Sequence, residues 1–217
     1  MRNHKLFFKE KLFTGVLISN LSLKNKLLDK LTEKYGEIDY ESSLMDFIYS
    51  DYYNKEMGTP IKKFFVAFEK LQYPDKLYKI KLETNRIEDC FRIDSKRKIN
   101  LDPGIINQSH LILATTKDGS HRIPVKQGIF CEITLLFEKG SYRPVEWTYP
   151  DFRSEEYLKI LNEIRNIYKK QIKNNKSVKF LINVCRVKDL HELEGKLATM
   201  FMGLKILCVS PIRLSLL

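Results

Sequence analysis

The order of apolar segments along the chain most constrains what it can fold into. Apolar residues recur every three or four positions over residues 23–35 and 77–91, and this spacing predicts two amphipathic helices. Short apolar runs, which are typical of buried strands, alternate with these helices at residues 12–19, 38–47, 61–71 and 98–101. The order strand, helix, strand, strand, helix, strand predicts a ferredoxin-like βαββαβ sheet.

Residues 111–150 extend this core. Apolar runs at residues 111–116 and 129–137 predict two further strands, and Gly140 marks a hairpin turn after the second of them. Ser154 then precedes a third helical stripe. We therefore expect an α+β fold in which the ferredoxin-like core sheet is extended by a β-hairpin and a further helix.

The composition changes near Lys169, where a polar, lysine-rich segment begins. We expect one α+β domain over residues 1–170 and a basic C-terminal extension of uncertain structure over residues 171–217. Within this extension, an apolar run at residues 178–187 predicts a strand. The extension is either native to the protein or the product of a frameshift or gene fusion.

The net charge of +11, with an isoelectric point near 9.4, favours anionic partners such as nucleic acid, nucleotides or phosphorylated molecules. A general richness in lysine explains the same charge without any partner, because no block of five consecutive basic residues occurs. No apolar run is long enough to predict a membrane span. The four cysteines are far apart, which fits reduced thiols in a cytoplasmic protein; they are Cys90, Cys131, Cys185 and Cys208.

A cluster of ionisable residues follows the strand at residues 111–116. His121 is the natural general acid or base, with Asp118 or Glu132 to orient it, since an unperturbed imidazole titrates near neutrality. Lys117 and Arg122 are suited to hold a phosphate or a carboxylate. The alternatives are a solvated hairpin loop and, for Glu132 in its apolar strand, a purely structural ion pair.

A second polar segment contains Asp51, Tyr52, Tyr53 and Glu56. The tyrosines suit stacking on a base, or they cover a sheet edge with their hydroxyls in water. Asp51 and Glu56, together with Asp102, are possible oxygen ligands for Mg²⁺. No metal-binding motif is present, so the metal and any other cofactor stay unknown.

Two further groups complete the set of candidates. Asp102 belongs to an Asp-Pro-Gly sequence, which is first of all a turn signal. Trp147, the single tryptophan, and Asp151 lie in a segment that we expect to pack over the end of the sheet. We therefore predict a composite pocket at one end of the sheet, with walls from four separate segments.

Several motifs occur in one order along residues 10–170: residues 51–53 (DYY) with 56–58 (EMG), 80–82 (IKL) with 84–85 (TN), 99–104 (INLDPG), 113–118 (LATTKD), 121–123 (HRI), 128–129 (GI) with 132–135 (EITL), and 147–151 (WTYPD). In these motifs the chain resembles the bacterial proteins grouped as domain of unknown function 4416. That family has no established function, so the resemblance implies no mechanism. Its members sometimes carry a GTP-binding label, but this chain lacks the G-x-x-x-x-G-K-[ST] phosphate loop.

Three functional hypotheses follow. The first is a cytosolic enzyme that holds or acts on a small anionic ligand, phosphorylated or a nucleotide. The second is a binding module for RNA or nucleotides, and the third is a non-catalytic structural or partner-binding protein. A Ser-His-Asp triad is not predicted, because no G-x-S-x-G elbow occurs. The oligomeric state stays open.

Overall fold

The computed structural model describes residues 7–186, with side chains through residue 174. The chain divides into two units, Met1–Lys170 and Gln171–Leu217, and the fold below is that of the first. The nine strands of its sheet are β1 (Lys11–Ile18), β2 (Ile38–Glu41), β3 (Met45–Asp46), β4 (Lys62–Phe68), β5 (Ile99–Ile106), β6 (His110–Thr115), β7 (Ile123–Lys126), β8 (Ile129–Glu138) and β9 (Ser141–Pro144). The helices are α1 (Lys24–Tyr35), α2 (Asn54–Met57), α3 (Leu77–Asp89) and α4 (Glu155–Arg186), with short 3-10 turns η1 (Leu21–Leu23), η2 (Pro74–Lys76) and η3 (Asp151–Arg153).

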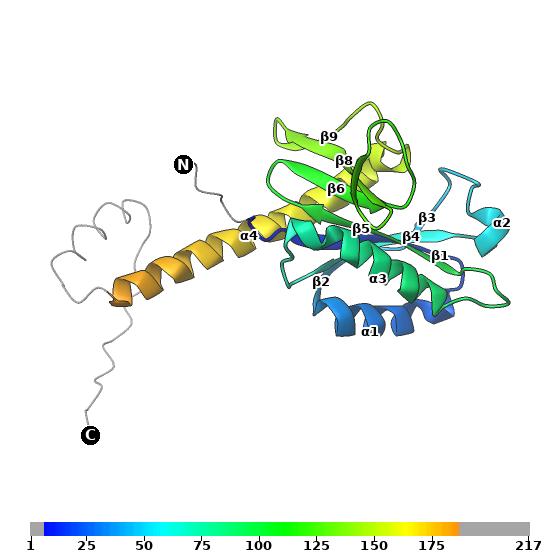
Figure 1. The fold of residues 1–217 in the computed structure, drawn as a ribbon, viewed down its shortest axis with the longest axis horizontal. Helices are drawn as coiled ribbons and strands as arrows, with labels where there is room; N and C mark the ends of the chain where they lie inside the picture. Colours follow the sequence, from blue (N-terminus) through cyan, green and yellow to red (C-terminus); the bar gives the residue numbers. More distant parts are fainter. Residues whose placement is uncertain (1–6, 187–217) are drawn as a thin grey trace, which may run out of the picture. The chain divides into compact units, whose positions relative to one another are not determined.

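The strands form one antiparallel sheet in the order β2-β4-β1-β5-β6-β8-β7 (Figure 1). β3 pairs with β4, and β9 pairs with β8. The α+β class is therefore confirmed. None of the helices in the described part of the chain is long and apolar enough to cross a membrane.

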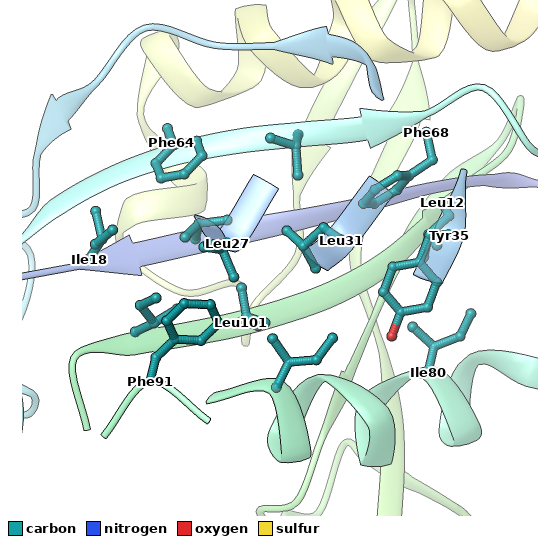
Figure 2. Packing of buried hydrophobic residues seen from close by; sticks show 14 residues of the cluster. Leu12, Ile18, Leu27, Leu31, Tyr35, Phe64, Phe68, Ile80, Phe91 and Leu101 are labelled. Atoms are coloured by element: carbon teal, nitrogen blue, oxygen red, sulfur yellow. The ribbon is translucent and has the colours of Figure 1, made fainter. Parts of the chain in front are cut away.

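The central strands β1 and β4 are apolar on both faces because successive side chains point to opposite sides of the sheet. Phe64, Val66 and Phe68 face α1 and α3, and Figure 2 shows the α1 residues Leu27 and Leu31 packed in the same cluster. The alternate residues of these strands lie in a second cluster with the first turns of α4; this cluster includes Phe13, Phe65, Ala67, Tyr157 and Leu161. Helices thus cover both faces of the sheet.

The pairing of β5 with β6 ends early. It runs from Ile106↔Leu111 to Gly104↔Leu113, whereas β5 stays paired with β1 as far as Ile99. At Gly104 the strands are so close that a Cβ would lie 2.6 Å from the Ile112 carbonyl oxygen. Beyond this point the strands separate, and the sheet is open between them.

Two expectations about secondary structure are wrong. The Asp102-Pro103-Gly104 sequence is not a turn but part of β5. Pro103 is tolerated because it points its backbone nitrogen, like Leu101 two residues earlier, toward the side where β6 has separated. The strand expected at residues 178–187 is instead helical to Arg186, since α4 contains no Gly or Pro that would end it. The rest of the predicted extension lies outside the described residues.

Candidate functional site

A cavity of about 520 Å³ lies where β5 and β6 separate. It is bordered by residues of both strands, by α3, by Lys63 on β4, by Glu132 on β8, by the segment before α2 and by the segment that leads into α4. Since these parts of the chain are far apart in sequence, only the completed sheet brings them together.

Two side chains of α3 occupy the hydrogen-bonding edge that β6 leaves free. Lys81 donates to the carbonyl oxygen of Leu101 at 2.6 Å, and Glu88 accepts from the Leu101 N–H at 2.8 Å. The two residues are seven positions apart, which places them on one face of the helix. They satisfy the backbone of β5 as a neighbouring strand would, and so they stabilise the opening.

An arginine extends this network to α2. Arg97 donates to Glu88 at 2.9 Å, to Asn100 at 3.0 Å and to Glu56 at 2.8 Å. Lys81 lies 3.7 Å from Asp102 Oδ1 and 3.9 Å from Glu88 Oε1. Burial raises the pKa of the Glu88 carboxyl, and the charges of Lys81 and Arg97 oppose that rise.

Lys63 lies on the other side of the cavity and is only 1% exposed. Its Nζ is 3.7 Å from Asp151 Oδ2, which is an ion-pair distance but too long for a hydrogen bond. Four aromatic rings surround the ammonium at 5.4–5.9 Å from their centroids; they belong to Phe47, Phe65, Phe152 and Tyr157. Gly15 leaves the space that the amine uses, because a Cβ there would lie 3.1 Å from Lys63 Cε and Nζ.

The ionisation of Asp151 provides a pH-dependent test of this arrangement. Burial raises the pKa of the Asp151 carboxyl above its ordinary 3.8, although Lys63 opposes the rise. The contribution of this group to stability is therefore complete below pH 3.8 and is lost as the pH rises through the folded-state pKa. As the pH rises from 3.8 through the folded-state pKa, the wild type loses this stabilisation and Asp151→Asn does not. We therefore expect the free energy of unfolding of Asp151→Asn, minus that of the wild type, to increase over this pH range. Urea titrations of both proteins over a pH series measure the difference, and a difference that falls with pH would contradict it.

Glu132 is the centre of a third polar group and is 1% exposed. It accepts from Arg122 Nε at 2.7 Å and is 3.1 Å from His121 Nε2. Arg122 also donates to the Tyr149 hydroxyl, whose pKa burial raises to about 12. Trp147 stacks on His121 with 5.4 Å between ring centroids. Carboxylate, imidazole and guanidinium thus meet behind one wall of the cavity.

The family model for domain of unknown function 4416 matches residues 8–168. The chain belongs to this family. The match covers all of β1 to β9 and reaches into α4, so the cavity lies wholly within the family domain. No curated protein and no solved structure gave a match.

Within the family domain, half of the predicted site residues border the cavity; they are Tyr52, Tyr53, Asp102, Lys117, Glu132 and Asp151. His121 and Arg122 reach it through Glu132. Arg122 is unsuited to the predicted anion clamp, because it also donates to the carbonyls of Lys117 and Asp118.

The remaining predicted residues have local structural contacts. Asp51 accepts from Asn54 at 2.6 Å, and Asp118 accepts from the Gly119 N–H at 2.7 Å. Trp147 donates to the Ile133 carbonyl at 2.8 Å. Among the residues that the structure describes, no group of three His, Cys, Asp or Glu side chains could hold a metal ion, so Asp51, Glu56 and Asp102 do not form one.

Sequence reasoning missed the buried cations. Lys63 belongs to an apolar strand and shares its face with Phe65 and Ala67, so period-two alternation could have identified it as an inward-pointing charge. Lys81 and Glu88 share one helical face, but their role depends on the separation of β5 from β6. Nothing in the local sequence indicates that separation.

Proposed function

We propose that the cavity binds a small anionic ligand and that Lys63 is its principal cation. One observation carries the proposal: Lys63 Nζ borders the cavity and makes no hydrogen bond with any residue that the structure describes. A buried ammonium with unused N–H donors is costly unless a partner supplies acceptors. An anionic group in the cavity would supply them.

The mouth of the cavity favours a ligand that also has a planar or apolar part. Tyr52 and Tyr53 lie edge to face with ring centroids 5.0 Å apart, and Lys117 Nζ is 4.0 Å from the Tyr52 ring centroid. A phosphorylated compound or a nucleotide combines an anion for Lys63 with a ring for these tyrosines. The tyrosines border a cavity of about 520 Å³, a size that favours a small ligand over RNA.

An enzymatic role is the second candidate. Glu132 borders the cavity and is 3.1 Å from His121, so a proton could pass between the cavity wall and the imidazole. In this proposal Glu132 is the group nearest the ligand, and His121 acts through it. Asp118 does not border the cavity, and its Oδ1 accepts from the Gly119 N–H, so this proposal gives it no role.

We also infer a ferredoxin-like relationship for the first half of the domain and a cytoplasmic location. The order β2-β4-β1-β5, with α1 after β1 and α3 after β4, supports the former. The free thiols of Cys90 and Cys131 are compatible with the latter.

A thermal-shift screen tests ligand binding. The full chain would be heated with inorganic phosphate, pyrophosphate, nucleoside monophosphates, dicarboxylates and 2-oxo acids, with sodium chloride matched for ionic strength. A ligand present at 100 times its dissociation constant should stabilise the wild type by about 2.7 kcal/mol. We expect Lys63→Met to lose that shift.

Lys62→Met is the matched control, because Lys62 is the preceding residue of β4 and pairs with Asp46 at the surface. It should keep the full shift. If Lys63→Met does not fold, Lys63→Gln, which also removes the charge, replaces it, and direct calorimetry measures anion binding to the wild type. The proposal fails if no anion stabilises the wild type beyond the chloride control, or if both lysine variants keep the same shift.

A further inference from the structure

Lys63 differs from the other cations of the cavity. Lys81 donates to a backbone carbonyl, Arg97 is bound by two carboxylates, and Lys117 rests on the Tyr52 ring. Lys63 has one carboxylate at 3.7 Å and aromatic rings on its other sides. Of these four side chains, Lys63 and Lys117 make no side-chain hydrogen bond to the described residues, and of these two only Lys63 is buried and lies beside a carboxylate.

We propose that the Lys63 amine forms an imine with the carbonyl carbon of a small anionic oxo compound, such as a 2-oxo acid. This inference rests on the proposed function, since it names the chemical class of the anionic ligand. Three features carry it: an amine at the wall of a cavity, a carboxylate at ion-pair distance that a small side-chain movement would bring into hydrogen-bond contact with that amine, and an apolar surrounding that limits water.

Imine formation at Lys63 needs only one other side chain, Asp151, to accept and return a proton. The Lys63 ammonium gives one proton to the Asp151 carboxylate, and the amine nitrogen then attacks the carbonyl carbon of the ligand. A C–N bond forms, the carbonyl oxygen takes a proton from that nitrogen, and a carbinolamine results. Asp151 next protonates the hydroxyl, which leaves as water while the C=N bond forms. The products are a protonated imine, water and the original carboxylate.

The position of Asp151 suits this exchange. It is the first residue of η3. Its Oδ1 accepts a hydrogen bond from the Phe152 N–H at 3.0 Å, and its Oδ2 is the oxygen nearest Lys63 Nζ, at 3.7 Å. Burial raises the pKa of its carboxyl, so it holds a proton more readily than an exposed aspartate would. Gly15 leaves space beside the amine that any larger residue would fill.

Reductive trapping tests the inference on the intact chain. The protein would be incubated with glyoxylate and sodium cyanoborohydride, which reduces an imine to a stable carboxymethyl-lysine, and the modified residue located by peptide mass spectrometry. We expect modification of Lys63 to be roughly tenfold faster than that of Lys62, because a bound carbonyl has a raised effective concentration at the amine. Lys62 is an internal control, as the two lysines are adjacent and Lys62 is partly exposed to solvent.

Two variants extend the test. Lys63→Arg keeps the positive charge but cannot form an imine, so selective trapping should disappear. Asp151→Asn should slow trapping at Lys63 and leave trapping at Lys62 unchanged. Glyoxylate that stabilises the wild type in a Lys63-dependent way, with Lys63 and Lys62 modified at equal rates, would overturn the imine and leave anion binding intact. Absence of selective trapping, together with no stabilisation by any anion of the thermal-shift screen, would overturn both proposals.

Discussion

Arg122→Ala should lower the free energy of unfolding by about 3–5 kcal/mol, because it leaves a buried carboxylate without its main cation. Glu132 is 1% exposed, and the shortest hydrogen bond that it accepts comes from Arg122 Nε at 2.7 Å. In the variant, the other ionisable partner of Glu132 is the His121 imidazole at 3.1 Å, which carries a charge only when it is protonated. The same substitution releases the carbonyls of Lys117 and Asp118, so the loop between β6 and β7 should also loosen.

Chemical denaturation followed by circular dichroism measures the loss. Arg143→Ala is the control, since Arg143 is an exposed arginine on the neighbouring strand β9, and its removal should change stability by no more than about 0.5 kcal/mol. The double substitution Arg122→Ala with Glu132→Gln should recover part of the loss, because the amide carries no charge. A loss below about 1 kcal/mol for Arg122→Ala would mean that Glu132 finds another partner or is protonated.

Glu88→Ala is expected to cost about 3 kcal/mol and to abolish the ligand-induced thermal shift. The substitution leaves the Leu101 N–H without an acceptor and removes one of the two carboxylates that hold Arg97. Lys81 would keep only Asp102 as a charged partner. Because Glu88 and Lys81 together satisfy the edge of β5, losing one of them should let the strand move into the cavity.

Glu83→Ala provides the comparison on the same helix. Glu83 pairs with Lys34, which is half exposed, at 3.2 Å, and a pair of this kind contributes at most about 1 kcal/mol. Denaturation measures the stability of both variants, and the thermal-shift screen measures ligand binding. If Glu88→Ala and Glu83→Ala lost equal stability and kept equal ligand shifts, Glu88 would have no special role at the edge of β5.

Much of the fold follows from local pattern. The stripes of α1 and α3 and the apolar runs of β1, β4, β6 and β8 were predictable because burial on one face sets the spacing of apolar residues. Asp102-Pro103-Gly104 was not, because its turn chemistry is outweighed by the pairing of β5 with β1. The C-terminal part of α4 was misassigned because a short apolar run fits a strand and a helix equally well.

The candidate site was predictable only in part. The proximity of His121, Arg122 and Glu132 followed from two neighbouring strands and the cost of burying a lone carboxylate. The other half of the cavity depends on contacts between distant segments, such as Lys63 with Asp151 and Lys81 with Leu101. No local pattern encodes these pairings, because they require the strand order of the completed sheet.

The separation of β5 from β6 also has a thermodynamic consequence. A sheet whose strands paired to their ends would gain hydrogen bonds and stability, but it would leave no space for a ligand. In this protein the strands are already apart, with Lys81 and Glu88 in the place of the missing partner. The free energy of opening is thus a cost of folding and not of binding, which preorganises the cavity. Stability and affinity are therefore opposed at this position, and variants selected only for thermal stability would tend to close it.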